Sequence, residues 1–86
     1  VKYTIVIEKT AEKFIMRLAQ PEKERVLKAI HELPHKGDIK RLQGKKSRGM
    51  YRLRGGPYRI IYTVDNGQLV VCVVDAGNRG QIYNRY

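Results

Sequence analysis

Residues 58–76 read YRIIYTVDNGQLVVCVVDA, and this stretch decides the fold. Side chains alternate in character over residues 58–65, as they do in a half-buried strand. Asn66-Gly67 is a strong signal for a two-residue type I′ hairpin turn. Residues 69–76 are apolar at nearly every position, which indicates a central strand covered on both faces. The stretch therefore predicts an antiparallel hairpin inside a sheet.

The residues before this hairpin predict one more strand on each side of two helices. Residues 3–8 are rich in β-branched side chains and predict a first strand. We expect Thr10 to cap a first helix and Pro21 to occupy the first position of a second helix. Residues 50–54 predict a strand that precedes the hairpin. The order of elements is thus strand, α-hairpin and antiparallel three-stranded meander.

This order predicts a single α+β domain over residues 1–86, with one sheet and its helices on one face. Residues 34–49 are polar and basic, so we expect a loop there with at most a short strand. The tail after Gly77 is polar and is expected to form no more than a helical turn.

The charge and composition of the chain limit the range of possible functions. Its 18 Lys and Arg residues oppose 8 Asp and Glu, for a formal net charge of +10. The excess positive charges repel one another, which indicates that the partner is a polyanion or an acidic protein. The single cysteine, Cys72, excludes an internal disulfide and a multi-cysteine metal site, so we expect a reducing cytoplasmic location and neither metal nor cofactor. No apolar stretch approaches the roughly 18 residues of a membrane span, so we expect no membrane partner.

The hairpin registers predict which side chains share a face. A two-residue turn would set Asp65 opposite Gln68, and hence Ile61 opposite Cys72. For the preceding turn, an even register groups Arg52, Arg54 and Arg59 on the face away from the helices. An odd register would bury two unpaired guanidinium groups under the helices, at prohibitive cost. The even register, and with it an open arginine face, is therefore predicted.

Further basic residues surround this face. No Asp or Glu lies between positions 38 and 65, and the tail adds Arg79, Tyr83 and Arg85. A phosphodiester backbone would offset the crowded charge, and stacking of a base on a tyrosine is worth roughly 1–3 kcal/mol. A solvated basic face with no specific role remains the alternative. We predict that RNA contacts Lys40, Arg41, Lys45, Lys46, Arg48 and Arg85.

Three segments together resemble the RelE toxins of the RelE/ParE superfamily: YRLR at 51–54, YRIIY at 58–62 and GNRGQIY at 77–83. LQG at 42–44 also fits, so the resemblance covers nearly the whole chain. It implies the toxin of a type II toxin–antitoxin module, acting as a ribosome-dependent, metal-independent endoribonuclease (mRNA interferase). The implied partners are a RelB-like antitoxin, the A site of the 30S ribosomal subunit and mRNA. The implied chemistry is attack of a 2′-hydroxyl on the adjacent phosphate.

The resemblance also implies roles for five catalytic residues. Arg52 and Arg54 match a basic pair that is often lysine in the family. Arg59 matches an arginine that clamps phosphate, and Arg79 one that stabilises the transition state or the leaving group. Tyr83 matches a tyrosine that orients the nucleotide and assists proton transfer. Arginine effectively never gives up its proton, so Tyr83 is left as the expected proton carrier of the open face.

Other readings stay open at this point. One is the ParE branch of the superfamily, which poisons DNA gyrase and does not cut RNA. Another is a non-catalytic module that binds RNA or the ribosome, because Asn78 stands where related toxins often carry His or Lys. His31 and His35 are expected on the helix layer and therefore away from the chemistry. Cys72 is expected to be a core residue.

Overall fold

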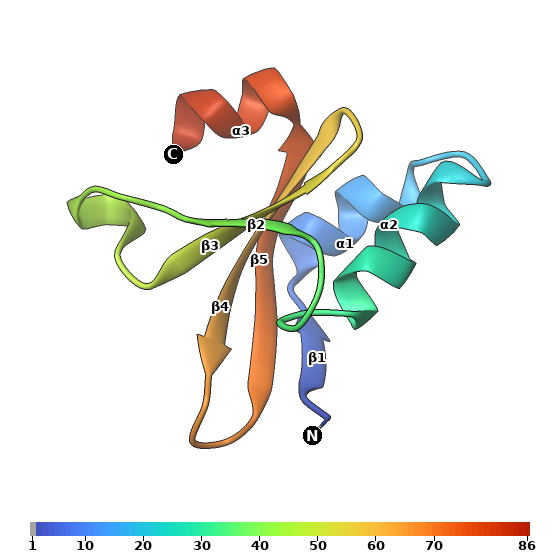
Figure 1. Ribbon diagram of the computed structural model, residues 1–86. Helices are drawn as coiled ribbons and strands as arrows, with labels where there is room; N and C mark the ends of the chain where they lie inside the picture. The colour runs from blue at the N-terminus through green and yellow to red at the C-terminus, as the bar shows by residue number, and fades with distance from the viewer. Residues whose placement is uncertain (1) are drawn as a thin grey trace.

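The computed structural model describes residues 2–86, apart from the side chain of Lys46. Within them, five strands form one sheet, accompanied by three α-helices and one 3-10 turn (Figure 1). In chain order the elements are β1 (Thr4–Ile7), α1 (Lys9–Met16), α2 (Glu22–His31), β2 (Asp38–Arg41), η1 (Lys45–Ser47), β3 (Met50–Gly55), β4 (Tyr58–Asp65), β5 (Val70–Asn78) and α3 (Arg79–Arg85). The predicted α+β class with a single sheet is confirmed. No helix in this part of the chain is both long and apolar enough to cross a membrane.

The strands lie in the order β1-β5-β4-β3-β2. From β2 to β5 every neighbour is antiparallel, whereas β1 runs parallel to β5 at one edge. The α-hairpin of α1 and α2 carries the chain across one face of the sheet, from β1 at one edge to β2 at the other. β5 is thus an inner strand, as its apolar sequence predicts.

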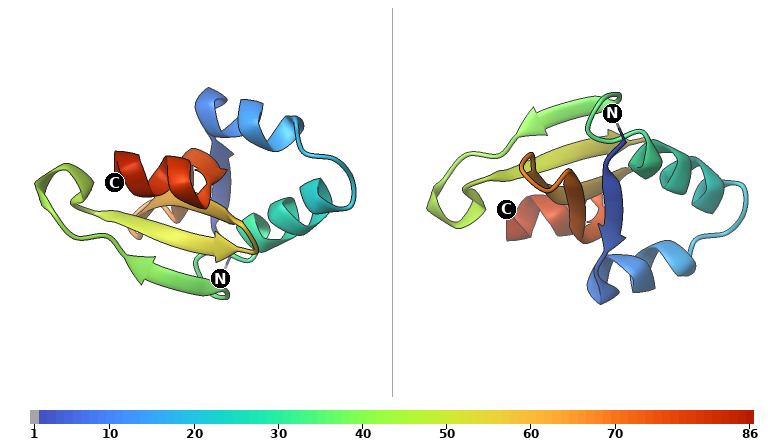
Figure 2. Two further views of the ribbon diagram at one scale, coloured as in Figure 1. Left: turned by 90° about the horizontal axis from the view of Figure 1, so that it is seen from above. Right: turned by 90° about the horizontal axis from the view of Figure 1, so that it is seen from below.

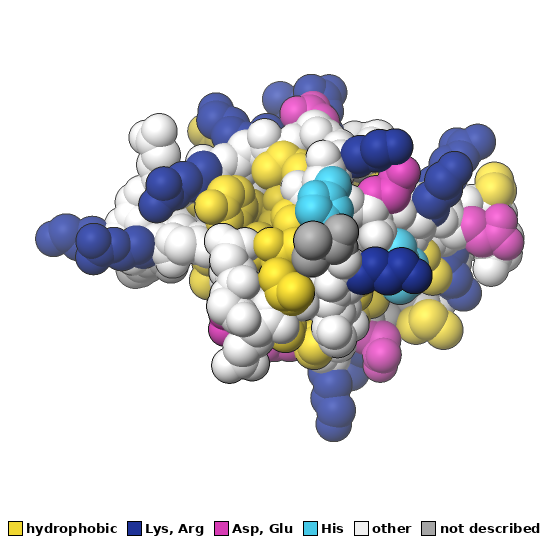
Figure 3. All heavy atoms as spheres, turned by 60° about the horizontal axis from the view of Figure 1, so that its bottom comes forward, with side chains coloured by type: hydrophobic (Ala, Val, Ile, Leu, Met, Phe, Trp, Pro, Cys, Tyr) yellow, Lys and Arg dark blue, Asp and Glu magenta, His cyan; other side chains and the backbone are white. Residues whose placement is uncertain are grey.

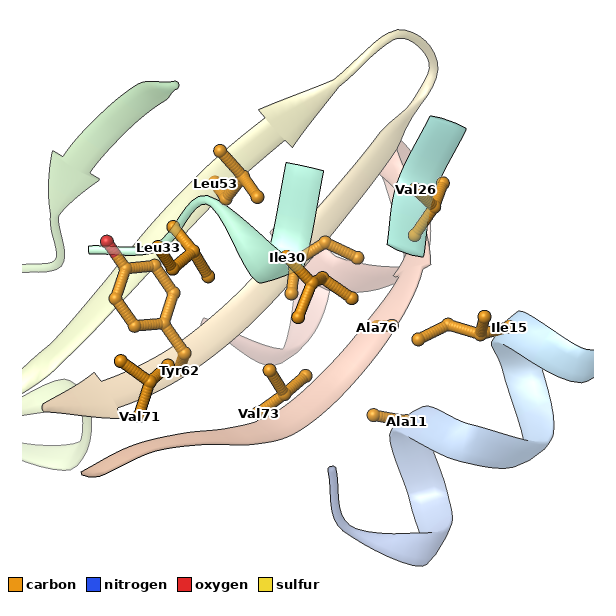
Figure 4. Close-up of a cluster of buried hydrophobic side chains, with 11 residues drawn as sticks. Ala11, Ile15, Val26, Ile30, Leu33, Leu53, Tyr62, Val71, Val73 and Ala76 are labelled. Carbon is orange, nitrogen blue, oxygen red and sulfur yellow. The ribbon is translucent and has the colours of Figure 1, made fainter. Parts of the chain in front are cut away.

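The main core lies between the sheet and α1 with α2 (Figure 4). Both helices direct their apolar stripe at the sheet, and side chains from β3, β4 and β5 meet them. Complete burial of one such side chain stabilises the fold by about 1.5–3 kcal/mol. The residues labelled in this core are Ala11, Ile15, Val26, Ile30, Leu33, Leu53, Tyr62, Val71, Val73 and Ala76.

α3 corrects the expectation that the helices share one face. It lies apart from α1 and α2, over the other face of the sheet (Figure 2), and it buries Ile82 there. The contact is close because β5 offers Gly77 at this point. A Cβ atom on Gly77 would stand 3.1 Å from Gln81 Oε1 and 3.4 Å from Ile82 Cδ1. The tail is therefore a folded part of the molecule.

The predicted register between β3 and β4 is confirmed. Arg54 lies opposite Arg59, and Arg52 lies opposite Ile61. The three arginines consequently share the face that α1 and α2 leave open, as the cost of burying unpaired guanidinium groups requires.

The predicted register between β4 and β5 is wrong. Asp65 pairs with Val70 and not with Gln68, because the loop is two residues longer than a type I′ turn and Leu69 adopts a positive φ of 57°. A β-bulge follows: Tyr62 pairs with Val73, but Ile61 pairs with Asp75. The extra residue in β5 reverses which face the rest of the strand presents.

Helix boundaries differ slightly from prediction. Glu8, and not Thr10, is the N-cap residue of α1, and Pro21 is the N-cap of α2 and not its first helical residue. The basic segment was expected to be a loop with at most a short strand, and it contains the short strand β2 and, in addition, the turn η1.

Candidate nucleic-acid interface

A cleft of about 760 Å³ lies between α3 and the open face of the sheet. β2 and the residues after it form one wall, β3 and β4 form the floor, and α3 forms the other wall. We call it the basic cleft; its lining residues are Lys40, Arg41, Leu42, Gln43, Arg52, Arg54, Arg59, Arg79, Ile82, Tyr83 and Tyr86. None of these described lining residues is acidic.

The strand ladder brings the basic side chains of the cleft together. Lys40 on β2 lies opposite Arg52 on β3, and Arg54 on β3 lies opposite Arg59 on β4. Directly opposed side chains have Cβ atoms about 4.5–5.5 Å apart, a spacing at which like charges repel. An anion bound in the cleft would turn this repulsion into attraction.

Arg59 lies at the base of the cleft and is only 7 % exposed. Its Nη1 atom donates to the carbonyl oxygens of Tyr58 at 3.2 Å and Gly56 at 3.4 Å. Burial lowers the pKa of this guanidinium, and the charges of Arg54, Arg52 and Arg79 lower it further, against a weaker opposing effect of Asp38. A buried cation surrounded by cations is costly unless an anion compensates it.

Arg52 has a second uncompensated group. Its Nε atom is buried and donates to no acceptor in the described part of the protein. Leaving a buried donor unpaired costs about 1–3 kcal/mol, and more for a charged group. A phosphate oxygen in the basic cleft is an acceptor of the right charge.

α3 adds Arg79 and Tyr83, four positions apart and both lining the cleft. The Tyr83 side chain is 82 % exposed, so its ring is open to a ligand. The helix begins where the Arg79 backbone N–H donates to the Pro57 carbonyl oxygen at 3.1 Å and the Asn78 N–H donates to Gln81 Oε1 at 3.2 Å. Asn followed three positions later by Gln is a capping-box pattern, a signal for α3 that the sequence reading missed.

The structure separates the predicted RNA-binding residues into groups. Lys40 and Arg41 line the cleft, while Lys45 and Arg48 are exposed on the η1 segment outside it. Arg85 does not face the cleft opening but forms an ion pair with Asp75. The side chain of Lys46 lies outside the described residues.

Three titratable residues lie away from the cleft. His31 and His35 are exposed on the helix layer, as predicted, and His35 packs edge-on against Tyr3. Cys72 is half-buried outside the main core, with its Sγ 3.5 Å from Glu8 Oε1, and burial raises the pKa of its thiol. Its expected place in the core is wrong. Among the described side chains, no group of three His, Cys, Asp or Glu residues is arranged to hold a metal ion.

Comparison with known proteins adds the family. Residues 5–83 match the sequence model of a protein family, which is described as the ParE toxin of the type II toxin–antitoxin system parDE. The RelE–RelB complex of Pyrococcus horikoshii OT3 contains a chain with 26 % identity and a TM-score of 0.74, with 94 % of this chain and 99 % of that chain covered. A chain of the RelB–RelE antitoxin–toxin complex of Methanococcus jannaschii has 25 % identity and a TM-score of 0.72, with 94 % and 98 % covered.

The fold also recurs in the RelBE2 complex of Mycobacterium tuberculosis, with a TM-score of 0.77 at 23 % identity over 92 % of this chain and 100 % of that chain. A search of curated proteins gives no significant match. The family match spans β2, β3, β4 and most of α3, and it confirms the resemblance seen in the sequence. The chain is a member of the ParE toxin family of type II toxin–antitoxin systems, within the RelE/ParE superfamily.

Proposed function

We propose that this toxin is a ribosome-dependent endoribonuclease that holds mRNA in the basic cleft and cleaves it by attack of a 2′-hydroxyl on the adjacent phosphate. The observation that carries the proposal is Arg59, a guanidinium buried among three other arginines in a cleft with no acidic lining residue. Such a site is stabilised when a phosphate enters, and most when the phosphate gains a second negative charge.

The proposed roles follow from position. Arg59, fixed by two backbone carbonyl groups, clamps the scissile phosphate from the base of the cleft. Arg52 and Arg54 flank it from β3, and Arg79 approaches from α3. Together they stabilise the charge that develops on the pentacoordinate phosphorus, while Tyr83 stacks on or orients a neighbouring base.

Cleavage also requires proton transfer. A base must accept the proton of the 2′-hydroxyl, and an acid must protonate the 5′-oxygen that leaves. Arginine does neither effectively. Among the described cleft residues, Lys40 and Tyr83 line opposite walls, and we assign the two proton transfers to them. Lys40, which was expected only to bind RNA, lies opposite Arg52 in the cleft, and we propose it as the second proton carrier.

The partners we propose are a RelB-like antitoxin and the A site of the 30S subunit with its mRNA, hence a cytoplasmic site of action. Support comes from the matching structures, which are RelE–RelB complexes. An antitoxin that covers the basic cleft with acidic side chains would compete directly with RNA for the same arginines.

Primer extension on mRNA from a translating extract tests the proposal. Wild-type protein is expected to produce breaks within codons of the translated region and to leave free RNA largely intact. The double variant Arg59→Ala/Arg79→Ala is expected to lose these breaks. A matched control, Arg17→Ala/Lys28→Ala, removes two exposed cations from the helix layer and is expected to cut like wild type. Full cleavage by the Arg59→Ala/Arg79→Ala protein would refute the proposal.

Inhibition of DNA gyrase is the second candidate, because the matching family model is that of the ParE toxin of parDE. A supercoiling assay separates the two functions. Inhibition of gyrase without breaks in mRNA would favour the ParE-type function, whereas binding to ribosomes without either effect would indicate a non-catalytic module.

A further inference from the structure

Asp75 is an acidic residue on the same sheet face as the arginines, and it owes this place to the β-bulge. In a regular ladder its side chain would follow Val71 and Val73 into the main core. Because Ile61 pairs with Asp75 while Tyr62 pairs with Val73, the side chain emerges on the side of α3. The bulge thus delivers a carboxylate to the floor beneath α3.

This carboxylate is 5 % exposed and fully engaged. Arg85 donates from Nε to Oδ2 at 3.0 Å and from a terminal nitrogen to Oδ1 at 3.2 Å. The Tyr86 hydroxyl donates to Oδ2 at 3.3 Å, and the Ala76 backbone N–H donates to Oδ1 at 2.8 Å. We call the set Asp75, Arg85 and Tyr86 the α3 clamp. A buried carboxylate left without such donors would be strongly destabilising.

The α3 clamp fixes the C-terminal end of α3, a helix that depends on contacts with the sheet for its stability. α3 has 7 residues, too few for a stable helix in isolation. Its first turn is tied to the Pro57 carbonyl, and its middle is held by Ile82 over Gly77. The last turn of α3 is fixed to the sheet by the α3 clamp. In the sequence, Tyr83 follows the buried Ile82 and precedes Arg85 of the clamp, so the helix is anchored on both sides of it.

We propose that Asp75 is a positioning residue for the basic cleft. By binding Arg85 and Tyr86, it fixes the angle of α3 so that Arg79 and Tyr83 face the arginines of the sheet. The inference rests on the proposed function for its effect on cleavage, but the clamp itself can be tested without RNA. Arg85 is on this account a structural cation, because its charge is already neutralised by Asp75.

Hydrogen exchange of the full-length toxin tests the clamp directly. In Asp75→Asn, amides of residues 79–86 are expected to exchange at least about tenfold faster than in wild type, while amides of β3 and β4 keep their rates. Arg85→Gln changes the partner of the pair whose side chain is 48 % exposed, and it should show the same local effect. Glu32→Gln removes one exposed negative charge from the helix layer and serves as control.

Cleavage then tests the positioning role. In both clamp variants we expect kcat for ribosome-bound mRNA to fall by about tenfold or more, and the Kd for a 2′-deoxy analogue to change by less than about threefold. Arg85→Lys should recover part of the loss, and the double variant Asp75→Asn/Arg85→Gln should be no worse than either single change.

Unchanged exchange of residues 79–86 in Asp75→Asn, or faster exchange spread evenly over the whole sheet, would overturn the clamp. A local change in exchange with unchanged kcat would overturn the positioning role. If wild-type protein cuts no RNA, the proposed function fails while the exchange experiment still decides whether Asp75 fixes α3.

Discussion

Arg85 and Arg59 show that the same residue type can have two different roles in this toxin. Arg85 is half exposed yet pairs with a buried carboxylate, so its charge is used within the fold. Arg59 is buried among other cations, and the groups it contacts are backbone carbonyls that cannot neutralise it. The surroundings therefore distinguish the two residues. The charge of Arg85 is neutralised within the fold, whereas the charge of Arg59 remains available to an anion.

Arg59→Lys tests whether the shape of the guanidinium matters as well as its charge. Lysine keeps one positive charge but loses the planar group that donates to the two carbonyl oxygens and has further N–H donors for the proposed phosphate. We expect the affinity for a 2′-deoxy RNA analogue to fall about tenfold, measured by fluorescence anisotropy. Arg54→Lys, at an exposed position of the same cluster, should change affinity much less. Equal affinities of the two variants would contradict this view of Arg59.

Lys40→Arg separates binding from proton transfer. Arginine preserves the charge at this position of the cleft but does not exchange a proton. Single-turnover cleavage on ribosomes should therefore slow by on the order of a hundredfold, with the affinity for RNA retained. Arg41→Lys, the neighbouring change in the reverse direction, is the control. Cleavage at the wild-type rate by Lys40→Arg would assign the proton transfers to Tyr83 or to the ribosome.

At the scale of elements, the two hairpins explain what the sequence could and could not predict. The register of β3 with β4 followed from energy, because the wrong choice buries Arg52 and Arg54. The register of β4 with β5 had no comparable penalty. Neither the longer turn, with Leu69 at positive φ, nor the bulge beside Val73 has a signature in residue type. The five residues predicted to be catalytic do line one cleft, but the position of Asp75, which depends on the bulge, was not predicted.

A pair of glycines tests how α3 rests on β5. Gly77→Ala would push a methyl group against Gln81 and Ile82, whereas Gly80 has nothing within 4 Å of an added Cβ. Because alanine favours the helix over glycine by about 1 kcal/mol, Gly80→Ala should raise Tm. Gly77→Ala should lower Tm and reduce cleavage, because the side chains of Gln81 and Ile82 that hold α3 on β5 must shift to make room. Differential scanning calorimetry measures both, and a stabilising Gly77→Ala would show that α3 packs more loosely than described.

At the scale of the whole molecule, positive charge is spread widely. Lys and Arg side chains project around the rim of the molecule in Figure 3, which also shows the histidines on the face turned toward the viewer. A net charge of +10 therefore attracts any polyanion. Selectivity for the RNA of the proposed function would have to come from the cleft, where Arg59 is buried and held by two backbone carbonyl groups.

Stability of the whole molecule should fall at alkaline pH because of Tyr62. This tyrosine is 1 % exposed, and burial raises its pKa from 10.0 to about 12. Between these values the unfolded chain loses the phenol proton and the folded chain keeps it, so the free energy of unfolding decreases as pH rises. Urea titrations at several pH values should give a shallower decrease in the free energy of unfolding for Tyr62→Phe, the difference from wild type being about 3 kcal/mol at most. Tyr83→Phe, at an exposed ring, should follow the wild-type curve.

The parallel pairing of β1 with β5 has a consequence for biosynthesis. Thr4 is translated well before its partner Val70, because α1, α2, β2, η1, β3 and β4 lie between β1 and β5 along the chain. Until β5 has emerged from the exit tunnel, β1 has no neighbour, and α1 has no complete surface to pack on. The arginines of β3 and β4 are made earlier, but the cleft they share with α3 closes only afterwards. The ribosome that makes this toxin has therefore already passed β5 before the basic cleft exists.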